Sequence, residues 1–105
     1  MKVVMKFGGS SVGDYLSMRR VVRIVAQHVN DHPDDRIILV FSAMKGVTDR
    51  ILAVSKQAAD GDQKAVVSAV KNLSRRHKKT ARDLISNKRI LSQALAELDQ
   101  LLLEF

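Results

Sequence analysis

The run from Arg36 to Ser42, Arg-Ile-Ile-Leu-Val-Phe-Ser, is the feature that most constrains the fold of this chain. It is apolar without alternating polar positions, so a strand formed from it has apolar side chains on both faces. Such strands are typical of parallel sheets covered by helices. A second short strand is predicted at residues 2–7, and residues 14–31 between the two strands carry apolar side chains at helical spacing. A strand, a helix and a strand in this order form a right-handed crossover, so the sequence predicts an α/β fold.

The second half of the chain is predicted to be rich in helix, at residues 47–60, 63–86 and 89–105. Gly61 follows the first of these helices, where a C-cap glycine is expected. Two strands are marginal as a sheet, and the last helix ends in an apolar face with no partner. We therefore expect residues 1–105 to be the N-terminal portion of a larger domain, with exposed apolar surface. The alternative is a small dimer that buries those surfaces against its twin.

Composition excludes several classes of protein. At 46% hydrophobic and 28% charged residues the chain is globular, and without cysteine it forms neither disulfides nor thiolate metal sites. No apolar run approaches the roughly 18 residues that span a membrane, and no export signal is recognisable, so we expect a cytoplasmic protein without a membrane partner.

The formal net charge of +7 is compatible with a nucleic-acid partner or with anionic substrates. The densest basic stretch lies in the predicted helix 63–86, where Arg75, Lys78, Lys79 and Arg82 fall opposite an apolar stripe. That is the arrangement of a solvated helix face. No aromatic side chain is near to stack on bases, so we expect no nucleic-acid partner. His77 lies on the apolar stripe without a second ligand nearby, which favours a packing role over a metal site.

The first candidate binding segment is Lys6-Phe7-Gly8-Gly9-Ser10, which follows the first strand and leads into a helix. Glycines let backbone N–H groups approach anionic oxygens, and the N-terminus of the following helix favours negative charge. Lys6 adds a mobile charge. Because this lysine precedes the glycines, the loop differs from a Walker A loop. Alone, Lys6 could also be a strand-edge lysine in water, and the glycines could form an ordinary tight turn.

The second candidate segment, Ser42-Ala43-Met44-Lys45-Gly46-Val47-Thr48-Asp49, follows the second strand. In open parallel sheets, ligands bind beyond the carboxyl ends of the strands, where both segments are expected. Hydroxyl groups of Ser42 and Thr48 could there join the first loop around one anionic ligand. The simpler alternative is that both residues are helix caps.

Taken together, the two segments resemble the aspartate kinase branch of the amino-acid kinase family. Residues 4–13 match its opening K-F-G-G-[TS]-S-V, and residues 40–49 look like its V-S-A-M-x-G-V-T-[DN]. The departures are Ser10, where threonine is commoner, and Phe41, where valine is common. The resemblance implies a carbamate kinase-like fold, in which this chain supplies the N-terminal portion of an open, mostly parallel sheet covered by helices.

The resemblance further implies transfer of a phosphoryl group from ATP, carried with Mg²⁺, to the β-carboxylate of L-aspartate, the first step toward lysine, threonine and methionine. Lys6 would be the catalytic cation. The phosphate-binding residues would be Lys6, Phe7, Gly8, Gly9 and Ser10, and the aspartate-binding residues would be Ser42, Ala43 and Thr48, with no metal ligand from the chain.

We also expect a homo-oligomeric parent enzyme, and a 105-residue piece that is inactive alone. Alternatives are another kinase of the same superfamily, or a non-catalytic basic binding module.

Overall fold

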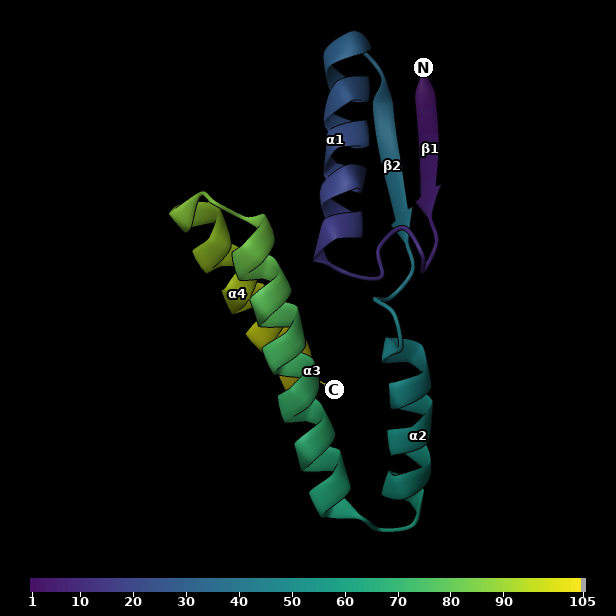
Figure 1. The fold of residues 1–105 in the computed structure, drawn as a ribbon, viewed down its shortest axis with the longest axis vertical. Coiled ribbons are helices and arrows are strands. Elements are labelled where there is room, and N and C mark those ends of the chain that lie inside the picture. The colour runs from purple at the N-terminus through teal and green to yellow at the C-terminus, as the bar shows by residue number, and fades with distance from the viewer. Residues whose placement is uncertain (105) are drawn as a thin grey trace. The chain divides into compact units, whose positions relative to one another are not determined.

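The computed structural model describes residues 1–104 and contains strands and helices in the predicted order (Figure 1). The elements are β1 (Lys2–Phe7), α1 (Tyr15–Asp31), β2 (Arg36–Phe41), α2 (Val47–Ala59), α3 (Gln63–Leu84) and α4 (Lys88–Leu103). The predicted α/β class is confirmed, and the predicted ends differ from the observed ones by only a residue or two, as fraying helix ends allow. The chain divides into two compact units, Met1–Gly46 and the three helices that begin at Val47.

The first unit is a two-stranded parallel sheet with α1 as its crossover. Lys2 lies opposite Arg36 and Phe7 lies opposite Phe41, so the strands start and end together. The rings of Phe7 and Phe41 stack with centroids 5.5 Å apart. Figure 1 shows α1 packed alongside the two strands, which run in the same direction. Both following loops therefore leave the sheet at one edge.

Side chains of β1 alternate between the two faces of the sheet, as strand geometry requires. Those of Val3, Met5 and Phe7 are half-buried, whereas those of Lys2, Val4 and Lys6 are exposed. Phe7, the last of the half-buried row, lines a hollow together with Val21 and Ile24 of α1. Lys6 and Lys2 thus share the face of β1 that points away from α1, at opposite ends of the strand.

The expected burial of β2 on both faces is not seen in residues 1–104. Ile38 and Val40 are 54% and 43% exposed, and Phe41 is 51% exposed. The reason is that a sheet of two strands offers β2 few neighbours and, within the first unit, a single covering helix. The exposed apolar surface expected for the first portion of a larger domain is present, whereas the larger domain itself stays a prediction.

Local capping groups define where the helices begin and end. Asp14 is the N-cap of α1, as predicted, and Asp62 and Asn87 cap α3 and α4 by accepting backbone N–H groups. Gly61 follows α2 with a φ of +82°, the left-handed conformation that glycine adopts without strain. Short polar side chains and one glycine therefore account for the boundaries that the sequence predicted.

The second unit consists of α3 packed against both α2 and α4. Its buried side chains include Val54, Ala69 and Leu73. Lys78 was predicted to lie on a solvated face, but its side chain is only 27% exposed and its Nζ pairs with Asp99 Oδ1 of α4 at 2.5 Å. That prediction was wrong because it considered α3 alone, without the helix that packs beside it.

The last helix, α4, has no buried residue. Leu101 is 64% exposed and Leu103 is 82% exposed, in agreement with the apolar face predicted for the end of the chain. The predicted final helical residue, Phe105, lies outside the described residues.

Candidate functional site

The loop after β1 folds back on a single carbonyl. The backbone N–H groups of Ser11 and Val12 donate to the carbonyl oxygen of Gly8, at N···O distances of 3.0 and 3.3 Å. Among residues 1–104, the N–H groups of Gly9 and Ser10 have no hydrogen-bond acceptor. The carbonyl oxygen of Gly8 is therefore hydrogen-bonded within the turn, whereas the N–H groups of Gly9 and Ser10 are available to a ligand. An anion-binding loop requires such donors.

Gly8 and Gly9 are not required by the geometry of this turn. Neither has a positive φ, and a Cβ built on either glycine would meet no atom within 4 Å. An ordinary tight turn would therefore accept alanine at both positions. The missing side chains instead leave open space beside free N–H groups, where an anionic ligand could approach the backbone closely.

Lys6 ends the exposed row of β1 directly before this loop. Its side chain is exposed, and within the described part of the chain its Nζ has no carboxylate partner. A full positive charge is thus available beside the glycine loop. The same exposure would suit a lysine that merely reaches water, so the role of Lys6 stays a prediction.

The loop after β2 is hydrogen-bonded to the end of β1 and to the first loop. The N–H of Ser42 donates to the carbonyl oxygen of Phe7 at 3.0 Å, and the N–H of Lys45 donates to the carbonyl oxygen of Gly13 at 3.3 Å. Ser42 and Ala43, two of the three predicted aspartate contacts, are exposed at this edge. The structure thus brings them to the same edge as Gly8 and Gly9.

Two glycines hold the paired loops in place. A Cβ on Gly13 would lie 2.9 Å from the carbonyl oxygen of Gly9 and 3.4 Å from the Cβ of Lys45. Gly46 has a φ of +81°, where any other L-residue is strained. These positions need glycine for the fold itself, in contrast to Gly8 and Gly9.

Thr48, the third predicted aspartate contact, is the second residue of α2 and belongs to the other unit. Its side chain is exposed, so its hydroxyl is available to a ligand. Since Thr48 lies inside the first turn of α2, it does not cap the helix from outside. Its contact with aspartate stays a prediction.

The N-terminus of α1 is occupied by the chain's own carboxylate. Asp14 Oδ1 accepts the N–H of Ser17 at 2.8 Å, and this hydrogen bond holds the pKa of Asp14 below its ordinary value. This carboxylate occupies the N–H of Ser17 and places a negative charge at the helix end, where it would compete with an external anion. That this helix end helps to bind a phosphate stays a prediction, beside the loop amides and Lys6.

A hollow of about 240 Å³ lies between the first loop and α1. Sequence reasoning placed Ser10 near a ligand but missed Ser17 and Arg20, which also line this hollow. Ser17 and Arg20 lie three residues apart on α1 and so share a face of that helix. This three-residue spacing is the signal in the sequence that could have identified Ser17 and Arg20.

Two further expectations concern metals and membranes. Residues 1–104 contain no group of three acidic or histidine side chains that could hold a metal ion. His77 Nδ1 lies 2.7 Å from the carbonyl oxygen of Leu73, which places a proton on Nδ1 and gives this half-buried histidine a structural partner. Across the same residues, no helix combines the length and the apolar character that a membrane span needs.

Comparisons with known proteins identify a family and several relatives of this chain. The sequence profile of the amino acid kinase family matches residues 1–104. The chain is 34% identical over 82 residues, 78% of its length, to a bifunctional aspartokinase/homoserine dehydrogenase 2 of Arabidopsis thaliana, of which it covers 8%. It is 42% identical over 60 residues, 55% of its length, to an aspartate kinase of Pseudomonas putida, of which it covers 14%.

One alignment extends over nearly the whole chain. An aspartokinase 3 of Arabidopsis thaliana is 34% identical over 104 residues, which is 94% of this chain and 17% of that protein. The chain therefore spans less than a fifth of the length of these relatives.

Proposed function

This chain belongs to the amino acid kinase family, and from that premise we propose that the whole protein transfers the γ-phosphoryl group of ATP to the β-carboxylate of L-aspartate. The relatives named as aspartokinases support this choice of substrate. Within the chain, the hydrogen-bonded pair of loops at one sheet edge supports it, because one loop offers amides and a lysine and the other offers a hydroxyl.

The single observation that carries the proposal is the openness of Gly8 and Gly9. Their backbone conformation and surroundings would accept a side chain, yet both positions lack one beside the free N–H groups of Gly9 and Ser10. In the open space beside these two glycines, phosphate oxygens can contact the backbone directly. A solvent-exposed turn with no ligand would gain nothing from two glycines.

In the proposed mechanism the nucleophile needs no activation. A carboxylate with a pKa near about 4 is ionised at neutral pH, so no general base is required. Catalysis then depends on position and on charge. Lys6 would neutralise charge on the transferring phosphoryl group, the amides after Phe7 would hold its oxygens, and Mg²⁺ would arrive on the ATP phosphates.

The second loop would bind the acceptor. Ser42 and Ala43 lie beside the first loop, and Thr48 would add a hydroxyl group from the start of α2. A cytoplasmic location is part of the same proposal, although two of the relatives carry the word chloroplastic in their names.

The Lys6→Ala substitution in the whole protein tests the proposal. Without the Lys6 ammonium beside the phosphoryl group being transferred, kcat should fall by about 10²–10³-fold. Removal of one group that stabilises charge in a transition state has an effect of this size. The measurement is aspartate-dependent release of ADP. Lys2→Ala is the matched control, because Lys2 lies on the same exposed face of β1 at the far end of the strand.

Three results would contradict the proposal. The first is an unchanged kcat for Lys6→Ala, and the second is an equal loss for Lys2→Ala. The third is preference for another acceptor, such as glutamate or acetylglutamate, which would assign the protein to a different branch of the family. We further expect the 105-residue chain alone to show no turnover, because it spans less than a fifth of the length of the related aspartokinases.

A further inference from the structure

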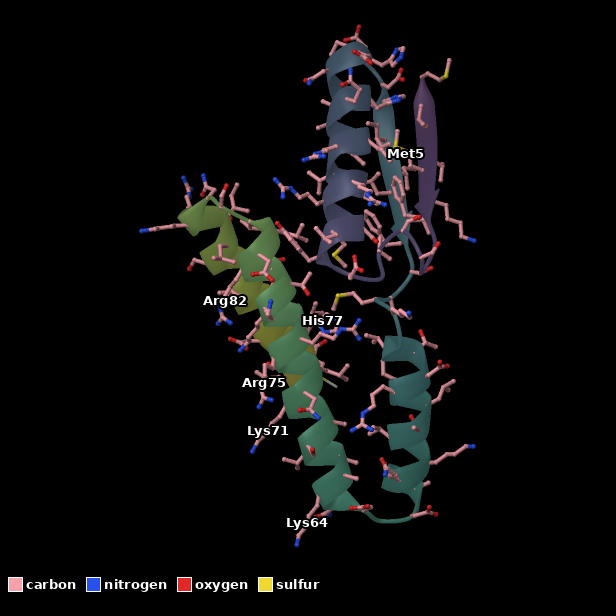
Figure 2. All side chains as sticks on the ribbon, in the orientation of Figure 1. Met5, Lys64, Lys71, Arg75, His77 and Arg82 are labelled. Atoms are coloured by element: carbon pink, nitrogen blue, oxygen red, sulfur yellow. The ribbon has the colours of Figure 1, made fainter. Side chains whose placement is uncertain are left out.

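Helix α3 carries a row of basic side chains that the proposed kinase reaction does not use. Lys64, Lys71, Arg75 and Arg82 are separated by seven, four and seven residues. At about 100° per residue they fall within about 40° of one another around the helix, over about 27 Å of its length. Figure 2 shows these four side chains along one side of α3. We call them the basic row.

The basic row is not neutralised by the chain itself. Within the described part of the chain none of its four members has an ion-pair partner, whereas the neighbouring Lys78 pairs with Asp99 and Lys79 pairs with Asp83. All four members are exposed. The row therefore presents four positive charges without ion-pair partners, whereas carboxylates of the chain pair with the lysines next to it.

Two hollows adjoin the basic row and share its central members, Lys71 and Arg75. One is about 530 Å³ and is also lined by Lys64, Val67 and polar side chains of α3. The other is about 500 Å³ and is also lined by Val70 and Ser74 of α3 and by Leu102, Leu103 and Asp99 of α4. Asp99, the one carboxylate among these lining residues, pairs with Lys78. Val67 is 54% exposed and Leu103 is 82% exposed. Each hollow therefore places at least one apolar side chain beside the cations.

We propose that the basic row and its two hollows bind an acidic amphipathic helix of a partner polypeptide. Carboxylates on such a helix would face the four cations, while apolar side chains on the same helix would enter the hollows beside Val67 and Leu103. Lys71 and Arg75, which border both hollows, would be the central contacts.

Two other occupants fit this surface less well. A helix of residues 1–104 from a second copy does not match the four cations, because none of the described helices has more than two acidic residues. Nucleic acid would leave the apolar lining without a partner, and residues 47–104 contain no aromatic side chain on which bases could stack.

The test uses a labelled helical peptide of about 20 residues, with glutamates at the spacing of the basic row and leucines beside them. The peptide is titrated against the whole protein by fluorescence anisotropy. We expect saturable binding that weakens by about tenfold in the double variant Lys71→Glu/Arg75→Glu, since two surface ion pairs are replaced by repulsion. Both residues are exposed, so the variant should fold normally, and circular dichroism checks this.

The matched control is Arg19→Glu/Arg23→Glu on α1, which makes the same charge change at the same four-residue spacing on exposed positions. It should leave binding unchanged. Equal weakening by both double variants would overturn the proposal in favour of diffuse electrostatic attraction. Absence of binding would overturn it as well, as would equal or tighter binding of a peptide with serines in place of leucines, or of a polyuridine oligonucleotide.

Discussion

The two ends of the first loop use glycine for different reasons. At Gly8 and Gly9 an added Cβ would meet no atom within 4 Å, and neither residue has a positive φ. Four residues later, a Cβ on Gly13 would lie 2.9 Å from the carbonyl oxygen of Gly9. The fold requires glycine at the second place and not at the first.

This difference separates residues that build the site from residues that would contact its ligand. Gly13 lets the first loop close on itself and lets its own carbonyl oxygen accept the N–H of Lys45 in the second loop. Gly8 and Gly9 have no such steric role among residues 1–104, and that a ligand approaches them from outside stays a prediction. The predictions below test that division directly.

Among the substitutions that test this division, the largest effect on catalysis is expected for Gly9→Ala in the whole protein. The methyl group would occupy the space through which phosphate oxygens approach the loop. Because a shift of the bound phosphate by up to about 1 Å is costly, kcat/KM should fall by about 10–100-fold. The melting temperature should stay unchanged, because the methyl group meets no protein atom. Steady-state kinetics at varied ATP and a thermal melt give both values. Unaltered kinetics would show that no ligand reaches this part of the loop.

An effect of similar size, on stability instead of catalysis, is expected for Gly13→Ala. Its methyl group would press on the Gly9 carbonyl, and overpacking of this sort costs about 1–3 kcal/mol of the free energy of unfolding. Urea unfolding measures the loss. Gly9→Ala is the matched control, since it adds the same methyl group four residues away in open space. If the two variants unfolded at the same urea concentration, the contrast between the two glycines would be wrong.

The smallest effect concerns pH and the capping residue that follows Gly13. The hydrogen bond from Ser17 lowers the pKa of Asp14 in the folded state, so Asp14 contributes stability above its unfolded pKa of about 3.8. That contribution is lost as the pH falls through the lower, folded value. In Asp14→Asn the side-chain oxygen still caps α1, but it does not titrate.

The measurement for this prediction is the melting temperature of both proteins from neutral pH down to about pH 3. The difference between them should be constant at neutral pH and should change, to the disadvantage of the natural protein, only in the acidic range. A difference that did not depend on pH would mean that Asp14 is not held in its charged form by the cap.

Much of the local structure followed from the sequence. Helical spacing of apolar residues located all four helices, and Asp14 and Gly61 were recognised as boundary residues because capping depends on neighbours in the chain. The resemblance to the amino acid kinase family rested on two contiguous motifs for the same reason. The burial of β2 was overestimated, since burial depends on elements that lie elsewhere in the sequence.

What the sequence by itself determined was therefore the set of elements, their order and the residue types in the two loops. The tertiary structure alone decided that the N–H of Ser42 bonds to Phe7, that Lys45 bonds to Gly13, and that Lys78 pairs with Asp99. It also decided that Gly8 and Gly9 face open space while Gly13 does not. The reason is physical: spacing and capping act over a few residues of the chain, whereas these contacts join segments that meet only once the chain has folded.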